Sequence, residues 1–226
     1  NYILDATVIA AMSLRGKSLL LVTSGILVII GLFGFFGISA SRESTKQTLT
    51  ERLALAKQVA HNMDSVIGQA FRQMGLVSPD DYARVSQGDS ATARSFLQEA
   101  RQRLPFRVHY VSLIDKQGTV LLTEPPIPAL IGLDISRRTY ISPVLSLRIP
   151  SVSNITYDNF IGRYVVYLVT PMSQLGDKPT SMAVGAALDL SYTTLVYLAD
   201  IGEVGQNGYI EIVDGDGVVL ATSNLP

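Results

Sequence analysis

The stretch YVSLIDKQGTVLLT, residues 110–123, decides the fold because it encodes a complete β-hairpin. Apolar and β-branched residues lie on both sides of the turn sequence DKQG, with the spacing of two strands. The aspartate side chain accepts hydrogen bonds from turn amides, and the glycine adopts the positive φ that a short hairpin turn needs. We therefore predict two antiparallel strands joined by residues 115–118.

The same pattern returns 99 residues later as YIEIVDGDGVVLAT, residues 209–222, with six of fourteen positions identical. A helix predicted over residues 191–201 precedes it, with Ser191 as its N-cap and Gly202 at its end. We interpret residues 202–226 as the start of a second, similar module. The turn DGDG looks superficially like a calcium loop, but it lacks the glutamate that completes an EF-hand, so a plain turn is favoured.

Further strands and helices surround the first hairpin. The sequence predicts three more strands, at residues 151–155, 163–170 and 181–190. Before the hairpin, Ser78 followed by Pro79 is typical of a helix N-terminus, and residues 90–104 are amphipathic. Antiparallel strands preceded by helices indicate an α+β domain over residues 78–201, a sheet with helices on one face.

A heptad-like seam precedes this domain. Apolar or small side chains follow a 4-3-4-3 spacing at Leu49, Leu53, Ala56, Ala60, Met63, Ile67, Ala70 and Met74. This spacing predicts a long stalk helix over residues 41–77. The seam fits packing against the chain's own domain and also contact with a second copy, and the two are compatible, so a homodimer is expected.

Residues 18–40 (SLLLVTSGILVIIGLFGFFGISA) contain no charged side chain. As a helix they would extend roughly 34 Å, enough for a bilayer core of about 30 Å. A cleaved signal peptide has an apolar region of about 7–15 residues, so the longer stretch favours an uncleaved anchor in the inner (plasma) membrane. The short basic flank, residues 1–17, is expected in the cytoplasm and the chain from Ser41 onward outside. Met12 is a plausible translation start within this flank.

Composition excludes several classes of protein. The chain is 47% apolar and 16% charged with a net charge of −1, which argues against disorder and against nucleic-acid binding. It has no cysteine and two histidines, His61 and His109, which leaves little for a metal site. No GxSxG, Gly-rich phosphate loop or HExxH is present, so we predict no catalytic residues, no cofactor and no metal.

One polar cluster remains as a candidate binding site. Its members are Asp134, Arg137, Arg138 and Tyr140 after the first hairpin, then Tyr157, Asp158 and Arg163, then Asp189 near the end of the last strand. A guanidinium suits a carboxylate or phosphate, and an acid across the pocket suits an amine, so the cluster could hold a small zwitterion. Alternatively, Arg138 pairs with Asp134 or Asp189 and merely pins the loop.

The order of these features resembles the double Cache family, the extracytoplasmic PAS-like sensors of bacterial transmembrane receptors. The segments that carry the resemblance are residues 110–118, the DISRRTY motif at 134–140, Gly162-Arg163 before a strand that ends at Pro171, the GAALDL motif at 185–190, and residues 208–217. The resemblance covers about residues 41–226.

The resemblance implies a long helix running along two stacked PAS-like modules, with the ligand in the membrane-distal one. It places Arg138 and Tyr140 in the pocket, Asp189 where amino-acid-binding members have an amine-binding carboxylate, and Tyr157 as a further candidate. Asp134 of the polar cluster is also a candidate ligand-binding residue. Amino-acid sensors of the family tend to carry R-x-W-Y, whereas Arg138 is followed by Thr-Tyr-Ile, so the resemblance leaves the ligand open.

We therefore expect a membrane-anchored sensing region that binds a small polar ligand, bearing a carboxylate or an amine, outside the cytoplasm. The receptor would be of the histidine kinase, diguanylate cyclase or chemoreceptor type, with its output domain elsewhere. A membrane-tethered structural module that binds another protein through the heptad face is the alternative. A third possibility, an anchored hydrolase, needs a nucleophile and a base that the sequence does not supply.

Overall fold

The structure is a computed structural model, and it describes residues 14–174, 178–190 and 211–222. The helix predicted over residues 191–201 and the start of the predicted second module, residues 202–210, lie outside the described residues. The chain divides into two compact units, Asn1–Leu55 and Ala56–Pro226. Each unit is therefore considered by itself.

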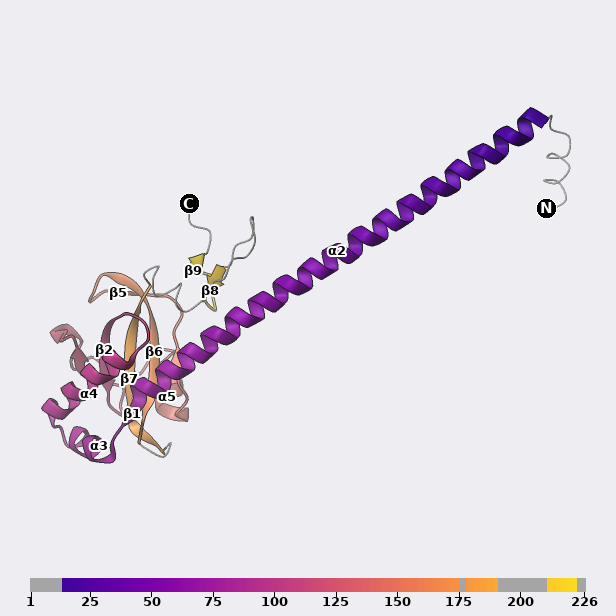
Figure 1. Ribbon diagram of the computed structural model, residues 1–226. Helices are drawn as coiled ribbons and strands as arrows, with labels where there is room; N and C mark the ends of the chain where they lie inside the picture. Colours follow the sequence, from indigo (N-terminus) through magenta and orange to yellow (C-terminus); the bar gives the residue numbers. More distant parts are fainter. Residues whose placement is uncertain (1–13, 175–177, 191–210, 223–226) are drawn as a thin grey trace. The chain divides into compact units, whose positions relative to one another are not determined.

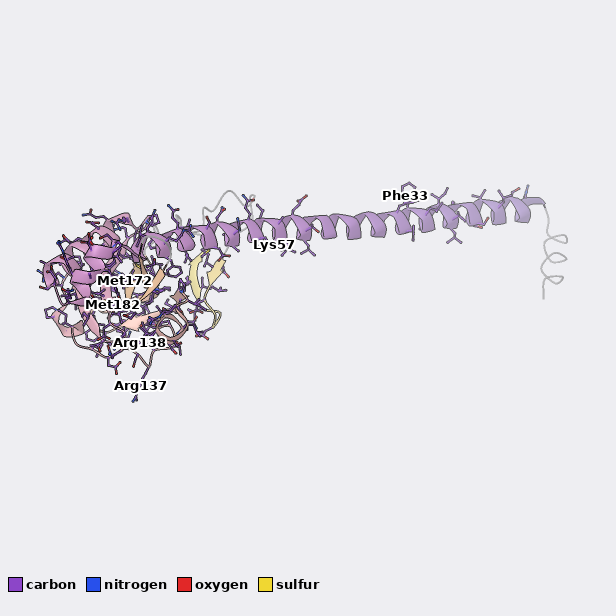
Figure 2. All side chains as sticks on the ribbon, turned by 90° about the horizontal axis from the view of Figure 1, so that it is seen from below. Phe33, Lys57, Arg137, Arg138, Met172 and Met182 are labelled. Atoms are coloured by element: carbon purple, nitrogen blue, oxygen red, sulfur yellow. The ribbon has the colours of Figure 1, made fainter. Side chains whose placement is uncertain are left out.

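The first unit contains the N-terminal part of helix α2 (Leu14–Gly75), which has 62 residues in all. Apolar side chains project from it, and Phe33 is 77% exposed (Figure 2). Within the described part of the chain, no helix combines the length and the apolar character needed to cross a membrane. This finding does not support the membrane span that the sequence predicts for residues 18–40.

The second unit is built on a seven-stranded sheet (Figure 1). Its main path runs in the order β1 (Leu76–Val77), β6 (Arg163–Gln174), β7 (Lys178–Asp189), β2 (Val108–Ile114) and β3 (Val120–Glu124), while β4 (Ser151–Val152) and β5 (Thr156–Asp158) also pair with β6. All pairs are antiparallel except β1 with β6. The hairpin predicted at residues 110–123 is confirmed as β2–β3, and Asp115 Oδ1 accepts from two amides of its turn.

Helices cover one face of this sheet. They are α3 (Pro79–Ser86), α4 (Ser90–Arg103) and the C-terminal end of α2 (Figure 1). The seam residues Ala70 and Met74 are buried there, which confirms packing against the chain's own domain. Helix α2 ends at Gly75, where a Cβ atom would lie 2.8 Å from the carbonyl oxygen of Pro171, so the close approach of helix and strand requires glycine.

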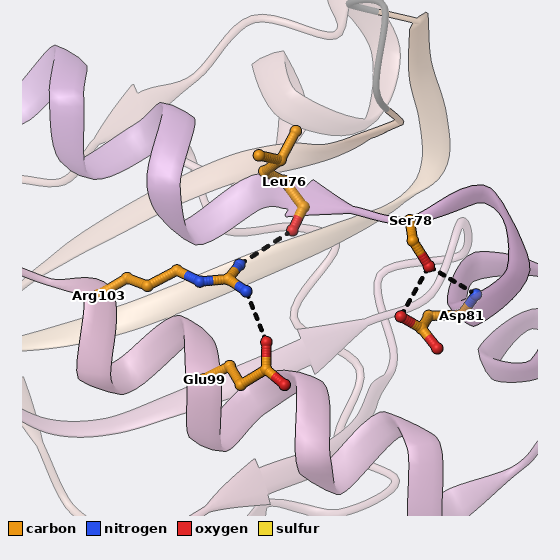
Figure 3. Close-up of polar contacts among 5 residues, drawn as sticks. All are labelled: Leu76, Ser78, Asp81, Glu99 and Arg103. Carbon is orange, nitrogen blue, oxygen red and sulfur yellow. Dashed lines mark hydrogen bonds and ion pairs between the residues drawn. The ribbon is translucent and has the colours of Figure 1, made fainter.

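The predicted N-terminus of α3 is confirmed. Ser78 Oγ accepts from Asp81 N at 3.1 Å and donates to Asp81 Oδ2 at 2.7 Å (Figure 3). Nearby, Arg103 of α4 forms an ion pair with Glu99 and donates to the carbonyl oxygen of Leu76 at 3.4 Å (Figure 3). The bond from Arg103 to Leu76 joins α4 to the short strand β1.

The other face of the sheet is covered by the segment between β3 and β4, which includes η1 (Pro128–Leu130) and α5 (Ser142–Leu147). The sequence predicted helices on one face only. Strand alternation fixes the two faces: Val166 and Leu168 of β6 belong to the helix-covered core, whereas Val165 and Tyr167 belong to the second core. The sheet is therefore buried on both sides.

A second hairpin, β8 (Glu211–Val213) with β9 (Val219–Thr222), forms a separate two-stranded sheet. Its turn repeats the first one: Asp214 N donates to Val218 O, and Gly217 adopts a φ of +80°. The predicted recurrence of the hairpin is thus confirmed. That it opens a second module stays a prediction.

Candidate functional site

A cavity of about 600 Å³ lies between the loop that carries Arg138 and the strands β4, β5 and β6. Its wall includes five residues of the polar cluster, Arg137, Arg138, Tyr140, Tyr157 and Asp158, together with Tyr167 of β6. A cavity of this size suits a small molecule, because ligand pockets have volumes of about 300–1,000 Å³.

Arg138 lies against aromatic side chains in this wall. Its Nη1 donates to Tyr140 Oη at 2.6 Å. The Tyr140 and Tyr167 rings stack at 5.0 Å between centroids and 13° between planes, and the guanidinium carbon lies 6.0 Å and 5.8 Å from the two centroids. Such contacts hold a cation by attraction to the ring faces. Among the described residues, no carboxylate forms an ion pair with Arg138.

The neighbouring Arg137 differs in position. Its side chain is exposed and projects from the surface, although it also borders the cavity (Figure 2). Arg138 is half-buried. The two arginines therefore form a matched pair for experiment, one in contact with the aromatic wall and one largely in solvent.

Asp158, at the end of β5, is 3% exposed. Its Oδ2 accepts from the hydroxyls of Tyr110 and Tyr167, both at 2.8 Å, and its Oδ1 accepts from Phe160 N at 2.8 Å. Burial raises the pKa of Tyr167 to about 12 and raises the pKa of Tyr110 further above its usual value. Both phenols are therefore neutral donors at neutral pH, and they occupy one oxygen of the carboxylate.

The structure does not bring Asp189 or Asp134 to this cavity. Asp189 ends β7 and lies 3.6 Å from His109 (Nε2 to Oδ1), at a separate surface cavity that Arg107 also borders. The exposed Asp134 accepts from Ser136 N at 2.9 Å, and this bond holds the pKa of its carboxyl below the usual value. The alternative in which Arg138 pairs with Asp134 or Asp189 is also not observed.

Tyr157 lies at the edge of the cavity. Its side chain is 49% exposed and packs edge-to-face on Tyr164, with ring centroids 5.1 Å apart. Tyr110 and Tyr167 are site residues that the sequence did not predict. The available signal was that both tyrosines lie in predicted strands, because a tyrosine buried in a sheet needs a hydrogen-bond partner for its hydroxyl.

The chemistry of the cavity suits binding. It offers a guanidinium, stacked aromatic rings and neutral hydroxyls, a set that can hold a planar anionic group such as a carboxylate. Within the described residues, no group of three or more histidine, aspartate or glutamate side chains could hold a metal ion.

Comparison with known proteins finds no matching family model and no matching curated protein. Solved structures do match. The ligand-binding domain of the Pseudomonas aeruginosa PAO1 amino acid chemoreceptor PctB, in complex with L-Arg, has a TM-score of 0.53 at 18% identity, over 76% of this chain and 69% of that one.

Two further matches have similar values. The ligand-binding domain of the Campylobacter jejuni chemoreceptor Tlp3, in complex with 4-methylisoleucine, has a TM-score of 0.53 at 17% identity, over 79% of this chain and 71% of that one. The sensor domain of the V. cholerae histidine kinase DctB has a TM-score of 0.50 at 16% identity, with 78% and 67% covered. For one solved chain that it resembles, an extracellular ligand binding receptor from Desulfohalobium retbaense, this chain spans 26% of the length. The α+β architecture predicted from the order of helices and strands is thus confirmed: this chain has the fold of chemoreceptor and histidine kinase sensor domains.

Proposed function

We propose that this chain is the extracytoplasmic sensing region of a membrane-anchored bacterial receptor, of the histidine kinase, diguanylate cyclase or chemoreceptor type. One observation carries the proposal: Arg138 lies half-buried on two aromatic rings in the wall of a 600 Å³ cavity, without an ion-pair partner among the described residues. A buried cation normally has a counter-charge, so the cavity favours an anion brought by a ligand.

The ligand is a small molecule with a carboxylate group. The zwitterion predicted from the sequence needs an acid for its amine, and Asp189 lies at a different cavity. Asp158 does line the cavity, but it already accepts three hydrogen bonds from the chain. These contacts favour recognition of a carboxylate by Arg138 over recognition of an amine by an acid.

Calorimetric titration of the full chain tests this site. The panel contains acetate, propionate, succinate, malate and the common L-amino acids. We expect at least one carboxylate to bind, and Arg138→Ala to weaken its binding by about a hundredfold, because a charge-assisted contact from a half-buried guanidinium is lost. Arg137→Ala is the matched control and should change affinity by less than about threefold. Unchanged binding in Arg138→Ala, or no binder in the panel, would refute the assignment.

The membrane anchor belongs to the same proposal and is supported by the uncharged stretch at residues 18–40. Fusion of alkaline phosphatase after residue 226 tests it in cells. The enzyme is active only after export, so activity supports an extracytoplasmic domain. Arginine substitutions at two positions within residues 25–34 should abolish that activity, because charges in the bilayer centre are costly. Activity unaffected by these changes contradicts the anchor.

We also propose that two copies associate along the N-terminal part of the seam. Leu49 and Leu53 are 62% and 56% exposed, and two exposed leucines at heptad spacing are typical of a coiled-coil contact. Leu49→Glu with Leu53→Glu should yield monomers in analytical ultracentrifugation. The same face serves the alternative function, a tethered module that binds a different protein, and a monomeric wild type would favour that alternative.

A further inference from the structure

The turn of hairpin β8–β9, residues 214–217, is hydrogen-bonded to a loop far away in sequence. Ile155 N donates to Asp214 Oδ2 at 3.1 Å, and Asn154 Nδ2 donates to Asp216 Oδ2 at 2.7 Å. Hydrogen bonds to a carboxylate are roughly twice as strong as those between neutral groups. Two adjacent residues of the loop are thus held by two acids of the turn.

The first hairpin provides a reference for this contact. Asp115 Oδ1 accepts from the amides two and four residues ahead, at 2.9 and 2.8 Å. Asp214 Oδ1 does the same, at 3.0 and 2.9 Å. The bonds within the two turns are therefore equivalent, and neither turn needs the loop for its own conformation.

The two turns differ at the positions between the aspartate and the final glycine. The first turn has Lys116 and Gln117 there, and the second has Gly215 and Asp216. Both differences occur where the second turn meets the loop. Asp216 supplies the acceptor for Asn154, and a Cβ atom on Gly215 would lie 3.0 Å from Asn154 Oδ1.

The same loop is a wall of the Arg138 cavity. Ser153 and Asn154 border that cavity on one side and border the space beside β8–β9 on the other. Ser153 N donates to Tyr167 O at 2.9 Å, and Tyr167 N donates to Ser153 Oγ at 2.8 Å. The Tyr167 hydroxyl in turn donates to Asp158. A continuous set of hydrogen bonds therefore connects the cavity wall to the loop.

We infer that residues 153–156 and the turn 214–217 form a clasp that couples the wall of the Arg138 cavity to the β8–β9 hairpin. A ligand that shifts Tyr167 or Asp158 displaces the loop, and the loop displaces the turn through Asn154 and Ile155. The role of a ligand rests on the proposed function, whereas the mechanical coupling does not. The clasp is the element whose two arrangements a ligand would bias.

Residue-resolved amide hydrogen exchange on the full chain tests the coupling without a ligand. Asp216→Ala removes one bond of the clasp. Gly215→Lys introduces the residue that the first turn has at this place, Lys116, and its side chain crowds Asn154. We expect both variants to speed amide exchange at Ile155 by about tenfold, because the loss of one charge-assisted hydrogen bond makes local opening easier. We also expect a several-fold increase at Tyr167 and Phe160, whose amides bond within the cavity wall.

Gln117→Ala is the matched control, because Gln117 holds the place of Asp216 in the first turn. It should leave exchange at Ile155, Phe160 and Tyr167 unchanged. Exchange that rises in both clasp variants at Ile155 but not at Tyr167 or Phe160 would overturn the inference, as would no change at Ile155.

A second arm uses the tightest-binding compound of the calorimetric panel at saturation. It should change exchange at the amides of residues 214–218 in the wild-type chain and have little effect there in Asp216→Ala. A ligand that binds without changing the turn overturns the coupling. A panel without any binder refutes the proposed function instead, and the ligand-free arm still decides the coupling.

Discussion

The two faces of the sheet share the same strands but are filled differently. On the face covered by α2, α3 and α4, alternate residues of β6 and β7 such as Leu168 and Val184 pack against aliphatic and aromatic side chains of the helices. On the other face, the same strands present Tyr167 beside Tyr110, and the covering segment contributes Tyr140 and Arg138. One face is closed by apolar packing, whereas the other combines a second apolar core with a hydrogen-bonded polar group beside a cavity.

Apolar packing stabilises the sheet on both faces, whereas the polar groups that can recognise a ligand lie on one face only. Burial of apolar side chains is favourable whatever apolar groups surround them. Such packing therefore stabilises the sheet but gives no specificity for a ligand. Buried polar groups must be paired, so the polar part of the cavity face also depends on its hydrogen bonds. Substitutions on the two faces should therefore differ in how much they lower the free energy of unfolding and in whether they change ligand binding.

The largest effect is expected on the helix-covered face. Leu97 of α4 has no exposed surface, and Leu97→Ala should lower the free energy of unfolding by about 3–4 kcal/mol, because it removes buried methyl groups and leaves a cavity. Ligand affinity of the folded protein should stay unchanged. Urea denaturation measures the loss. Leu121→Ala, at a side chain that is 37% exposed, is the control and should cost less than about 1 kcal/mol.

A smaller effect is expected on the cavity face. Asp158→Ala leaves the hydroxyls of Tyr110 and Tyr167 without their acceptor, and should lower the free energy of unfolding by about 2–3 kcal/mol. The test is recovery. Adding Tyr110→Phe and Tyr167→Phe to Asp158→Ala should regain part of the lost stability in denaturation experiments, since no buried hydroxyl is then left unpaired. A triple variant less stable than Asp158→Ala alone would contradict the polar character of this face.

The sequence predicted local features well because their causes are local. The hairpin at residues 110–123 and the Ser78 cap depend on residues close to one another in sequence, and the spacing of the seam residues indicates their helix. The short helix α5 was missed, since six residues give too little periodicity to stand out.

The candidate site was predicted only in part because its contacts are distant in sequence. Tyr110 and Asp158 are 48 residues apart, and no local pattern joins them. The acid expected across from Arg138 was Asp189, but β7 pairs with β2, and this pairing carries Asp189 to His109 at the end of the strand. Which end of a strand meets which loop depends on topology, so spacing along the chain could not show it.

The smallest expected effect is a pH dependence confined to the cavity face. The pKa of Tyr167 is raised from 10.0 to about 12 by burial, so between these values the unfolded chain releases a proton that the folded chain keeps. The stabilisation is complete below pH 10 and is lost as the pH rises toward 12. We expect the thermal midpoint to fall by a few °C between pH 9 and 11.

Tyr167→Phe isolates the contribution of this phenol. The variant should show a shallower fall of the thermal midpoint over the same range, while Leu97→Ala should follow the wild-type slope because it changes no ionisable group. Absorbance at 295 nm follows the phenols directly, and one phenol fewer should titrate above pH 11 in Tyr167→Phe than in the wild type. Equal slopes in wild type and Tyr167→Phe would mean that Tyr167 has the same pKa in the folded and the unfolded chain. That result would contradict the burial of its hydroxyl on the cavity face.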